Sequence, residues 1–326
     1  MGSVLLVQGD ARHIPLADQS VHMVCTSPPY WGLRTYGIGA DHGELGIESL
    51  HDCNGAFTGG ACGQCYACHL RAVAAEIWRV LRDDGTLWLN LGDSFSSGGR
   101  GTSLHHQEKL GFATATAQAL GRKSTAGVKP KNLLGIPWRV ALALQYDGWI
   151  LRSDIIWEKP SCMPESVRDR FTRSHEYVFL FAQHARYYFD QDAVREGYSA
   201  KGLNDAVHGY GYGLDSKMHQ AIKDGVHGAG GLNDPTITRD TFYQHGGRNA
   251  RTVWRITSEG YPGAHYATFP TALVEKCILA GTSQAGCCPA CHTPWLRIVG
   301  RQRLLDGHIP VTGAFSRPDE PFRIPP

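Results

Sequence analysis

Hydrophobic and polar residues alternate along most of the chain in blocks that predict strands and helices in turn. Short, mainly apolar runs predict strands, and apolar residues spaced three and four apart predict helices. Strands are expected over 4–8, 21–26, 86–91, 150–157 and 177–182, and helices over 72–81 and 136–144. Because strands that alternate with helices form parallel sheets, the sequence predicts an α/β fold with a doubly wound, mostly parallel sheet.

Three segments interrupt this alternation and are expected to form insertions. The first, 37–71, contains a group of cysteines, and the second, 95–130, is rich in Gly, Ser, Thr and Ala and is expected to be a mobile loop. The third, 195–252, is rich in Gly, His and Asp and has little apolar periodicity. The predicted divisions are a main α/β region over 1–194, the insert over 195–252, a segment with a cysteine knuckle over 253–302, and a proline-rich tail over 303–326.

The composition is that of a globular protein without a membrane span. Of the 326 residues, 42% are hydrophobic and 19% are charged, and no apolar run reaches the length of a transmembrane helix. The start of the chain has no basic and apolar leader, which predicts a cytoplasmic protein. The net charge of only +2 excludes a basic field over the whole fold, so any contact with nucleic acid must be a local patch.

Two groups of cysteines predict metal binding. In a cytoplasmic chain, clustered cysteines indicate metal ligands before disulfides, and four thiolates in a short segment suit tetrahedral zinc. Free buried cysteines are the alternative. The second group resembles one zinc knuckle, which cannot close a site alone and would have to lend its ligands to the first group. The predicted zinc ligands are Cys53, Cys62, Cys65 and Cys68, with Cys288 and Cys291 as further candidates.

The predicted strand 21–26 leads into the loop Thr26-Ser27-Pro28-Pro29-Tyr30-Trp31. Proline has a fixed φ and no N–H, so the carbonyl groups of this loop can point outward as acceptors. Ser27 adds a hydroxyl group and Tyr30 an aromatic face. Together they can hold an exocyclic amine while its planar ring stacks beside them, as an enzyme that acts on a flipped base requires. A proline-stiffened turn is the alternative.

The stretch from Gly9 to Arg34 resembles the amino-group DNA methyltransferases, which methylate cytosine N4 or adenine N6 with S-adenosylmethionine as the methyl donor. Segments similar to this family follow at 78–94, 157–177 and 263–270, in the permuted order of the beta class, where the catalytic half precedes the cofactor half. The resemblance implies a Rossmann-like S-adenosylmethionine-dependent methyltransferase fold. We assign target recognition to the 195–252 insert because it is large and polar and has no catalytic motif.

The resemblance also implies a direct transfer, in which the amine attacks the methyl carbon and acceptors in the loop favour a pyramidal nitrogen with developing positive charge. Serine before Pro-Pro is typical of cytosine-N4 enzymes, so cytosine is preferred to adenine. For Asp10, an exposed carboxylate at a strand end is the alternative. The expected catalytic residues are Ser27, Pro28, Pro29, Tyr30 and Asp10, and the expected cofactor-binding residues are Thr26, His265, Ala267, Phe269 and Pro270.

Two polar segments are expected to contact double-stranded DNA, the predicted partner. One lies between the last two predicted strands and would line the base pocket and hold flanking phosphates, and the other is a flexible basic turn suited to phosphate contact. A solvated ion-pair loop and an ordinary exposed turn are the alternatives, and Trp31 is either a core residue or a second wall of the pocket. The predicted DNA-binding residues are Trp31, Arg168, Arg170, Arg173, His175, Arg248, Asn249 and Arg251.

The chain departs from the family in one respect. The cofactor signature Asp-Pro-Phe-x-Gly-x-Gly-Thr, which in this branch follows the 263–270 segment, does not occur in the sequence. The resemblance therefore implies an incomplete methyltransferase: a truncated product, one half of a split enzyme that needs its C-terminal half, or a decayed enzyme. The missing strands would lie between 4–8 and 21–26, so an uncovered sheet edge is expected beside 21–26.

The leading function is a DNA amino-methyltransferase in a restriction or anti-restriction setting, with a restriction enzyme as a further partner. A non-catalytic, zinc-stabilised DNA-binding remnant is the alternative from a different class. An RNA or free-nucleotide methyltransferase is less favoured because the long 195–252 insert suits the reading of a duplex.

Overall fold

The structure is a computed structural model that describes residues 4–33, 44–48, 62–96, 128–197, 248–263, 268–290 and 292–297. The chain divides into two compact units. The first unit comprises Met1–Tyr188 with Thr252–Gly281, and the second comprises Phe189–Arg251 with Thr282–Pro326.

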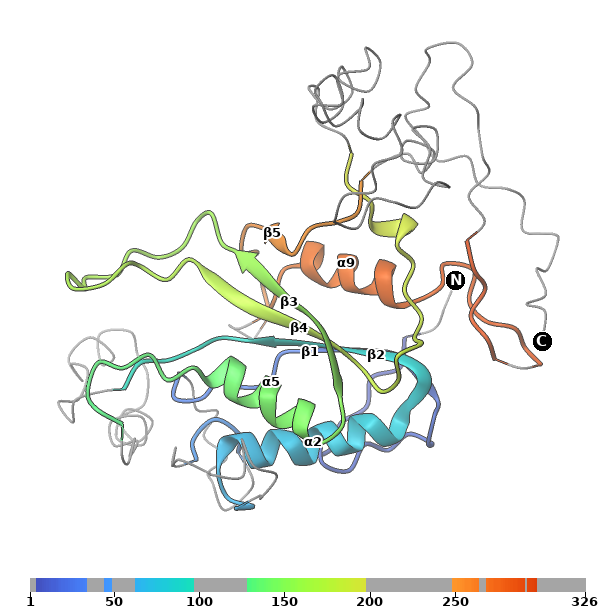
Figure 1. Cartoon of the computed structure of the whole chain (residues 1–326), viewed down its shortest axis with the longest axis horizontal. Coiled ribbons are helices and arrows are strands. Elements are labelled where there is room, and N and C mark those ends of the chain that lie inside the picture. Colours follow the sequence, from blue (N-terminus) through green and yellow to red (C-terminus); the bar gives the residue numbers. More distant parts are fainter. Residues whose placement is uncertain are drawn as a thin grey trace, which may run out of the picture. The chain divides into compact units, whose positions relative to one another are not determined.

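The first unit is built on a mixed five-stranded sheet (Figure 1). In spatial order the strands are β1 (Val21–Thr26), β2 (Leu81–Leu91), β4 (His175–Ala182), β3 (Ile150–Glu158) and β5 (Val253–Arg255). β1 is parallel to β2 and β3 to β5, whereas β4 is antiparallel to both of its neighbours. The prediction of a mostly parallel sheet was wrong. Parallel neighbours need a crossover, usually a helix, and the fully described connection 159–174 contains no helix.

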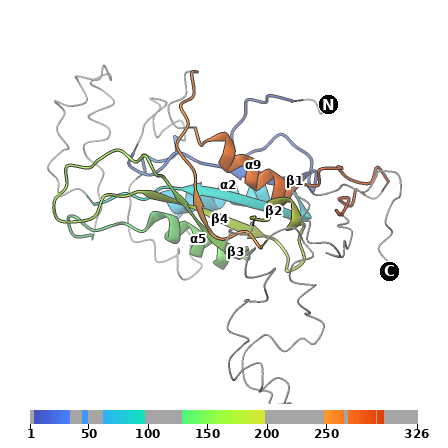
Figure 2. The same cartoon turned by 90° about the horizontal axis from the view of Figure 1, so that it is seen from above.

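Helices cover both faces of this sheet (Figures 1 and 2). They are α2 (Tyr66–Val80) and α5 (Ile136–Tyr146) on one face, and α9 (Thr271–Gly281) on the other. Successive side chains of β2 point to opposite faces. Leu89 joins the hydrophobic core with residues of α2 and α5, whereas Trp88 faces α9, where a Cβ on Gly281 would lie 3.0 Å from the indole Nε1. The predicted α/β fold with helices on both faces is confirmed.

Most predicted elements lie where the sequence placed them, but α2, β2 and β4 begin earlier, β4 by two residues, and β5 and α9 were not predicted. α2 begins at Tyr66 rather than at residue 72 because Tyr66 and Leu70 are buried and extend its apolar face into the cysteine-rich segment. β2 begins at Leu81 rather than at residue 86 because Leu81 pairs with Val21 ahead of a shift in register. None of the described helices is long and apolar enough to cross a membrane.

The N-terminal segment differs most from the prediction. Residues 4–8 form no strand, and the side chains of Val4, Leu5 and Leu6 are 88%, 80% and 91% exposed. An extended segment without a hydrogen-bonded neighbour gains none of the ladder energy that makes a strand. β1 is the last strand of the described sheet and pairs only with β2 there. Within the described part of the chain, the edge of β1 is therefore uncovered, as expected.

The described part of the second unit contains little regular structure. It has one short 3-10 helix, η2 (Asp192–Val194), and two isolated bridges, between Glu196 and Arg248 and between Cys287 and Pro294. Arg297 Nε lies 3.1 Å from Asp190 Oδ2, and the Asp190 side chain is only 6% exposed.

Candidate active site

The Ser27–Tyr30 loop follows β1 directly and is half-buried. α2 supports it, because the Tyr66 hydroxyl donates a hydrogen bond of 2.9 Å to the Pro29 carbonyl oxygen. Gly46 packs against the same loop with a φ of +92°, and a Cβ there would lie 3.1 Å from the Tyr30 carbonyl oxygen. Only glycine combines this backbone conformation with so close an approach. The structure thus places the loop at the carboxyl end of β1, with Tyr30 packed against the hydrophobic core.

The Tyr30 hydroxyl lies at the centre of a polar cluster formed by the ends of three strands. It is 2.6 Å from Glu176 Oε2, 2.8 Å from Asn90 Oδ1 and 3.4 Å from the Ser27 hydroxyl. The Tyr30 ring covers Gly92, where a Cβ would lie 2.5 Å from ring atom Cε2. Burial and the neighbouring Glu176 carboxylate raise the pKa of Tyr30 well above its usual value. The phenol is therefore a neutral donor at physiological pH.

A lysine neutralises the carboxylate of this cluster. Lys159 Nζ forms an ion pair with Glu176 Oε1, and it also lies 4.2 Å from the centroid of the Trp157 ring. The Asn90 amide donates a hydrogen bond of 3.0 Å to the Tyr177 carbonyl oxygen. The side chains of Lys159 and Glu176 are only 23% and 17% exposed. Each charge thus has its partner at short range, as partly buried charges require.

Asp93, just after β2, ties the end of that strand to the start of α5. Its carboxylate is 3% exposed and accepts hydrogen bonds from the backbone N–H of Gly135 (3.1 Å) and Ile136 (2.9 Å) at the start of the helix. Arg173 NH1 lies 3.5 Å from Asp93 Oδ2. The pKa of the adjacent His175 is lowered, first by burial and then by the positive charge of Arg173. His175 is therefore predominantly neutral at pH 7.

The predicted DNA-binding residues of this unit differ in their surroundings. Arg168 is exposed, but Arg170 forms an ion pair with Glu165 and lies 3.8 Å from the centroid of the Phe95 ring. Trp31 is a core residue, 3% exposed, whose indole N–H donates to the Glu48 carbonyl oxygen at 2.8 Å. A ring buried in this way cannot stack on a base, so the structure does not support the DNA contact predicted for Trp31.

The predicted basic turn of the second unit is folded onto an acidic residue. Arg248 NH2 lies 3.2 Å and Arg251 Nε 2.8 Å from Glu196 Oε2. Asn249 accepts a hydrogen bond of 3.0 Å from Arg195. The two arginines share one carboxylate, so the turn keeps a net positive charge.

Asp10 does not lie at the end of a strand as predicted. Its carboxylate binds Arg12 through Nε and NH2, at 3.0 and 2.8 Å, and also accepts the Arg12 backbone N–H. These hydrogen bonds lower the pKa of Asp10 to about 2. The expected strand 4–8 that would direct Asp10 toward the loop is not formed, so the structure does not place Asp10 in the site.

Three of the predicted cofactor-binding residues, Thr26, Phe269 and Pro270, can be located relative to the loop. α9 runs antiparallel to β1, since the Cys277 thiol interacts with that of Cys25 and the C-terminal glycine of the helix lies against the middle of the strand. Phe269 and Pro270, which directly precede α9, therefore lie toward the carboxyl end of β1, where Thr26 is found. The other two predicted residues, His265 and Ala267, lie outside the described residues.

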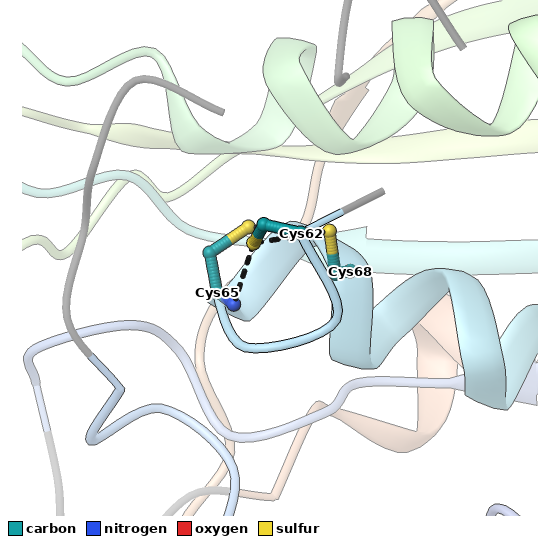
Figure 3. Close-up of side chains that lie close together, drawn as sticks. All are labelled: Cys62, Cys65 and Cys68. Atoms are coloured by element: carbon teal, nitrogen blue, oxygen red, sulfur yellow. Dashed lines mark hydrogen bonds between the residues drawn. The ribbon is translucent and has the colours of Figure 1, made fainter. Parts of the chain in front are cut away.

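Three of the predicted zinc ligands cluster where α2 begins (Figure 3). The Sγ atoms of Cys62, Cys65 and Cys68 all lie within 4.8 Å of one another. Cys62 Sγ also accepts the backbone N–H of Gln64 at 3.4 Å and of Cys65 at 3.3 Å. Cys288 belongs to a turn of the second unit, where its N–H donates to the Thr293 carbonyl oxygen at 2.9 Å. The remaining two candidates, Cys53 and Cys291, lie outside the described residues.

Comparison with known proteins identifies the family. The family model N6_N4_Mtase, described as DNA methylase, matches residues 21–288. The chain belongs to this DNA methylase family. The type II methyltransferase M.SmaI of Serratia marcescens is 39% identical over 287 residues, which are 87% of this chain and 77% of that protein. M.Cfr9I of Citrobacter freundii, also a type II methyltransferase, is 39% identical over 284 residues, 86% of this chain and 74% of that protein.

Among solved structures, the PvuII DNA methyltransferase (cytosine-N4-specific) gives a TM-score of 0.44 at 14% identity, over 84% of this chain and 69% of that chain. This TM-score and this sequence identity are too low to support the family assignment. The family match and the identity to M.SmaI suffice to establish a DNA methyltransferase of the N4/N6 amino-methylating family.

The sequence analysis did not select three polar residues that lie around the Tyr30 end of the Ser27–Tyr30 loop: Asn90, Lys159 and Glu176. A signal for one of them was present. Asn90 interrupts the apolar run Leu87–Leu91 and is only 1% exposed, and a polar residue inside a buried strand indicates a specific hydrogen-bonding role. Lys159 and Glu176 lie at the facing ends of β3 and β4. Their proximity depends on the antiparallel pairing that the sequence did not predict.

Proposed function

We propose that this DNA methyltransferase transfers a methyl group from S-adenosylmethionine to the N4 amino nitrogen of a flipped cytosine. The observation that carries the proposal is the half-buried Ser27–Tyr30 loop at the carboxyl end of β1, supported by the Tyr30–Glu176 hydrogen bond. The carboxyl ends of strands are where ligands of α/β proteins bind. Cytosine is preferred because serine precedes the two prolines; adenine N6 is the alternative.

The residues of the loop have distinct roles in this proposal. The Ser27 hydroxyl and the Pro28 carbonyl oxygen accept hydrogen bonds from the target amine and favour a pyramidal nitrogen as positive charge develops on it. Tyr30 provides an aromatic surface for the base, and its orientation is fixed because its hydroxyl is bonded to Glu176 and Asn90. Much of the rate enhancement comes from this positioning.

Bound S-adenosylmethionine would supply the methyl group. Thr26 at the end of β1 and the half-buried Phe269 ahead of α9 fit one side of such a cofactor, since both lie toward the loop. His265 and Ala267 are proposed to complete this side. Glu259 is not assigned to the cofactor, because its carboxylate accepts the Thr271 backbone N–H at 2.9 Å and caps α9.

We further propose double-stranded DNA as the substrate, with the 195–252 insert reading the sequence. Arg168, Arg170, Arg173 and His175 are proposed to contact the target strand, and Arg248, Asn249 and Arg251 the phosphates. A restriction enzyme is a proposed partner because M.SmaI and M.Cfr9I are type II methyltransferases. Dependence on a separate C-terminal half, and a cytoplasmic location, stay predictions. Zinc at the cysteine cluster is the second cofactor that we propose.

The test is Ser27→Ala in the full chain, with transfer of tritiated methyl groups to DNA as the measurement. We expect a rate lowered at least about tenfold, because one preorganised acceptor is lost. Ser20→Ala is the matched control, since the Ser20 hydroxyl is exposed and donates to the nearby Ala17 carbonyl oxygen. An unchanged rate in Ser27→Ala would exclude the proposed role of this hydroxyl.

Two further measurements separate the alternatives. Nucleoside analysis of the methylated DNA distinguishes N4-methylcytosine from N6-methyladenine. Calorimetry with S-adenosylmethionine distinguishes an enzyme from a non-catalytic DNA-binding remnant, because only the enzyme requires cofactor binding. A chain that binds DNA but not the cofactor, alone or with a supplied C-terminal half, would favour the remnant.

A further inference from the structure

The cysteine cluster at the start of α2 has the dimensions of a metal site. Cys65 Sγ lies 3.4 Å from Cys68 Sγ, which lies 3.6 Å from Cys62 Sγ. These separations exceed the disulfide bond length of about 2.05 Å. They approach the spacing of about 3.8 Å that follows from zinc–sulfur bonds of about 2.3 Å and tetrahedral angles. Cys65 and Cys68 are 2% and 7% exposed, so soft ligand atoms are held together away from bulk water.

α2 begins at this cluster without the usual stabilisation of a helix start. Cys65 is the N-cap residue but makes no side-chain capping hydrogen bond, and the first turn contains no acidic residue. The first backbone N–H groups of a helix need partners, and the partial positive charge there favours an anion. Three thiolates around one Zn²⁺ carry a net charge of −1, so a zinc–thiolate cluster would supply the missing negative charge.

The same turn of α2 is the part of the helix that touches the catalytic loop. Tyr66, 1% exposed, lies between the first and the last cysteine of the turn and donates to the Pro29 carbonyl oxygen at 2.9 Å. Next to Cys68, His69 Nδ1 lies 2.9 Å from Glu48 Oε1. Of the two side chains adjacent in sequence to the cysteines, Tyr66 therefore contacts the Ser27–Tyr30 loop and His69 contacts Glu48.

Glu48 connects His69 to the far end of the loop. Its Oε2 accepts the Gly46 backbone N–H at 2.8 Å, and its carbonyl oxygen accepts the Trp31 indole N–H at 2.8 Å. The Gly46 carbonyl oxygen in turn accepts the Gly32 N–H at 2.9 Å. These hydrogen bonds hold the loop at Trp31 and Gly32, while Tyr66 holds it at Pro29.

From this arrangement we infer that Cys62, Cys65 and Cys68 bind a structural zinc ion that fixes the catalytic loop through Tyr66 and His69. The role of the loop rests on the proposed function, whereas the metal site and its connection to the loop do not. Tyr66 is a positioning residue, since it contacts the Pro29 carbonyl group rather than a reacting atom. Loss of the metal releases the first turn of α2, and with it both anchors of the loop.

Elemental analysis of the purified full chain tests the metal site. We expect about one zinc per chain, and its loss in Cys65→Ser and Cys68→Ser. Cys162→Ser is the control, because Cys162 lies outside the cluster and should leave the zinc content unchanged. Replacement of zinc by Co²⁺ should produce the thiolate-to-cobalt charge-transfer bands of sulfur ligation. A folded chain without zinc and without these bands would overturn the site.

Hydrogen exchange tests the connection to the loop without reference to methylation. In the zinc-loaded chain the backbone N–H groups of Gly32 and Leu33 should be protected, because they donate to the Gly46 and Tyr30 carbonyl oxygens. Removal of zinc by a chelator should raise their exchange rates at least about tenfold, as local opening becomes easier. If the exchange of the 26–33 segment does not change on chelation, the metal does not fix the loop.

Tyr66→Phe separates positioning from stability. It removes the hydroxyl that bonds Pro29 while the buried ring is kept, so zinc content should not change. We expect kcat to fall about fivefold with unchanged KM for DNA and for S-adenosylmethionine, since geometry rather than binding is lost. Tyr146→Phe, on an exposed position of α5, is the control. An unchanged kcat in Tyr66→Phe would contradict the positioning role, while an inactive wild-type chain with intact zinc would refute only the proposed function.

Discussion

Glu176→Gln is the change that probes the candidate site most directly. Glu176 accepts the Tyr30 hydroxyl at 2.6 Å through one carboxylate oxygen and pairs with Lys159 through the other. Glutamine has nearly the same shape but no charge, and it has only one oxygen for these two donors. If Lys159 keeps that oxygen, the NH₂ group faces the Tyr30 hydroxyl and can only donate to it, and Tyr30 then donates to Asn90 Oδ1 alone. The substitution therefore removes the charge from both contacts and weakens both.

The magnitude follows from the burial of the pair. Hydrogen bonds to charged groups contribute about 1.5–3 kcal/mol, and side chains that are 17% and 23% exposed are only partly screened by water. We expect the free energy of unfolding to fall by about 2 kcal/mol, which corresponds to a decrease in Tm of about 4–8 °C for a unit of this size. Because Tyr30 loses its charged acceptor, we also expect kcat to fall about tenfold.

Thermal unfolding followed by circular dichroism and methyl transfer to DNA measure the two effects. Asp169→Asn is the matched control, because the Lys131–Asp169 ion pair is 80% and 57% exposed and such pairs contribute little. A double-mutant cycle with Lys159→Met isolates the energy of the pair. A Glu176→Gln variant whose Tm and kcat match those of the wild type would refute the role of this carboxylate.

Three other predictions concern residues near the same site. Gly92→Ala should lower kcat and cost about 1–3 kcal/mol of unfolding free energy, because the new Cβ would lie 2.5 Å from the Tyr30 ring. Thermal unfolding and methyl transfer to DNA measure the two effects. An unchanged Tm would contradict the close approach. Asp93→Ala should cost about 2–4 kcal/mol in denaturant unfolding, since it removes the cap of α5 and leaves Arg173 without its carboxylate. The pKa of His175 is lowered in the folded chain, so the unfolded chain binds a proton at this residue first as the pH falls. Below the ordinary histidine pKa of about 6.5, the unfolding free energy of the wild type should therefore fall more steeply with pH than that of His175→Gln. Parallel profiles of unfolding free energy against pH would disprove this.

The elements that periodicity predicted well are those buried on one or both faces. β1, β3, β4 and α5 have apolar positions whose spacing reflects a packed face, and burial is what the pattern measures. The helix α9 was not predicted. The sheet was less predictable, because pairing direction depends on what connects the strands. The 159–174 connection reads as a polar segment in the sequence, and nothing in it shows that β4 returns beside β3.

The errors at the N-terminus have a different origin. Val4–Val7 has the composition of a strand, but a strand also needs a neighbour, and no sequence pattern reports whether one is present. The segment is exposed along its length, and Asp10 consequently turns to Arg12 rather than toward the site. For Trp31 the core alternative holds rather than the predicted DNA contact. An aromatic residue next to a catalytic loop suggests a stacking surface, but Trp31 instead fills the core and holds the loop through its indole N–H.

The way the catalytic loop is held explains why its residues were recognisable and their supports were not. Two consecutive prolines provide no backbone N–H, so the loop can make few backbone hydrogen bonds of its own. Its carbonyl and hydroxyl groups are bound instead by side chains from elsewhere: Tyr66 on Pro29, Glu176 on Tyr30, and Ser94 on the Trp31 carbonyl oxygen at 2.7 Å. A local motif thus marks the loop to which we assign the chemistry. The positions that determine its geometry are distant in sequence, and only the three-dimensional structure brings them to the loop.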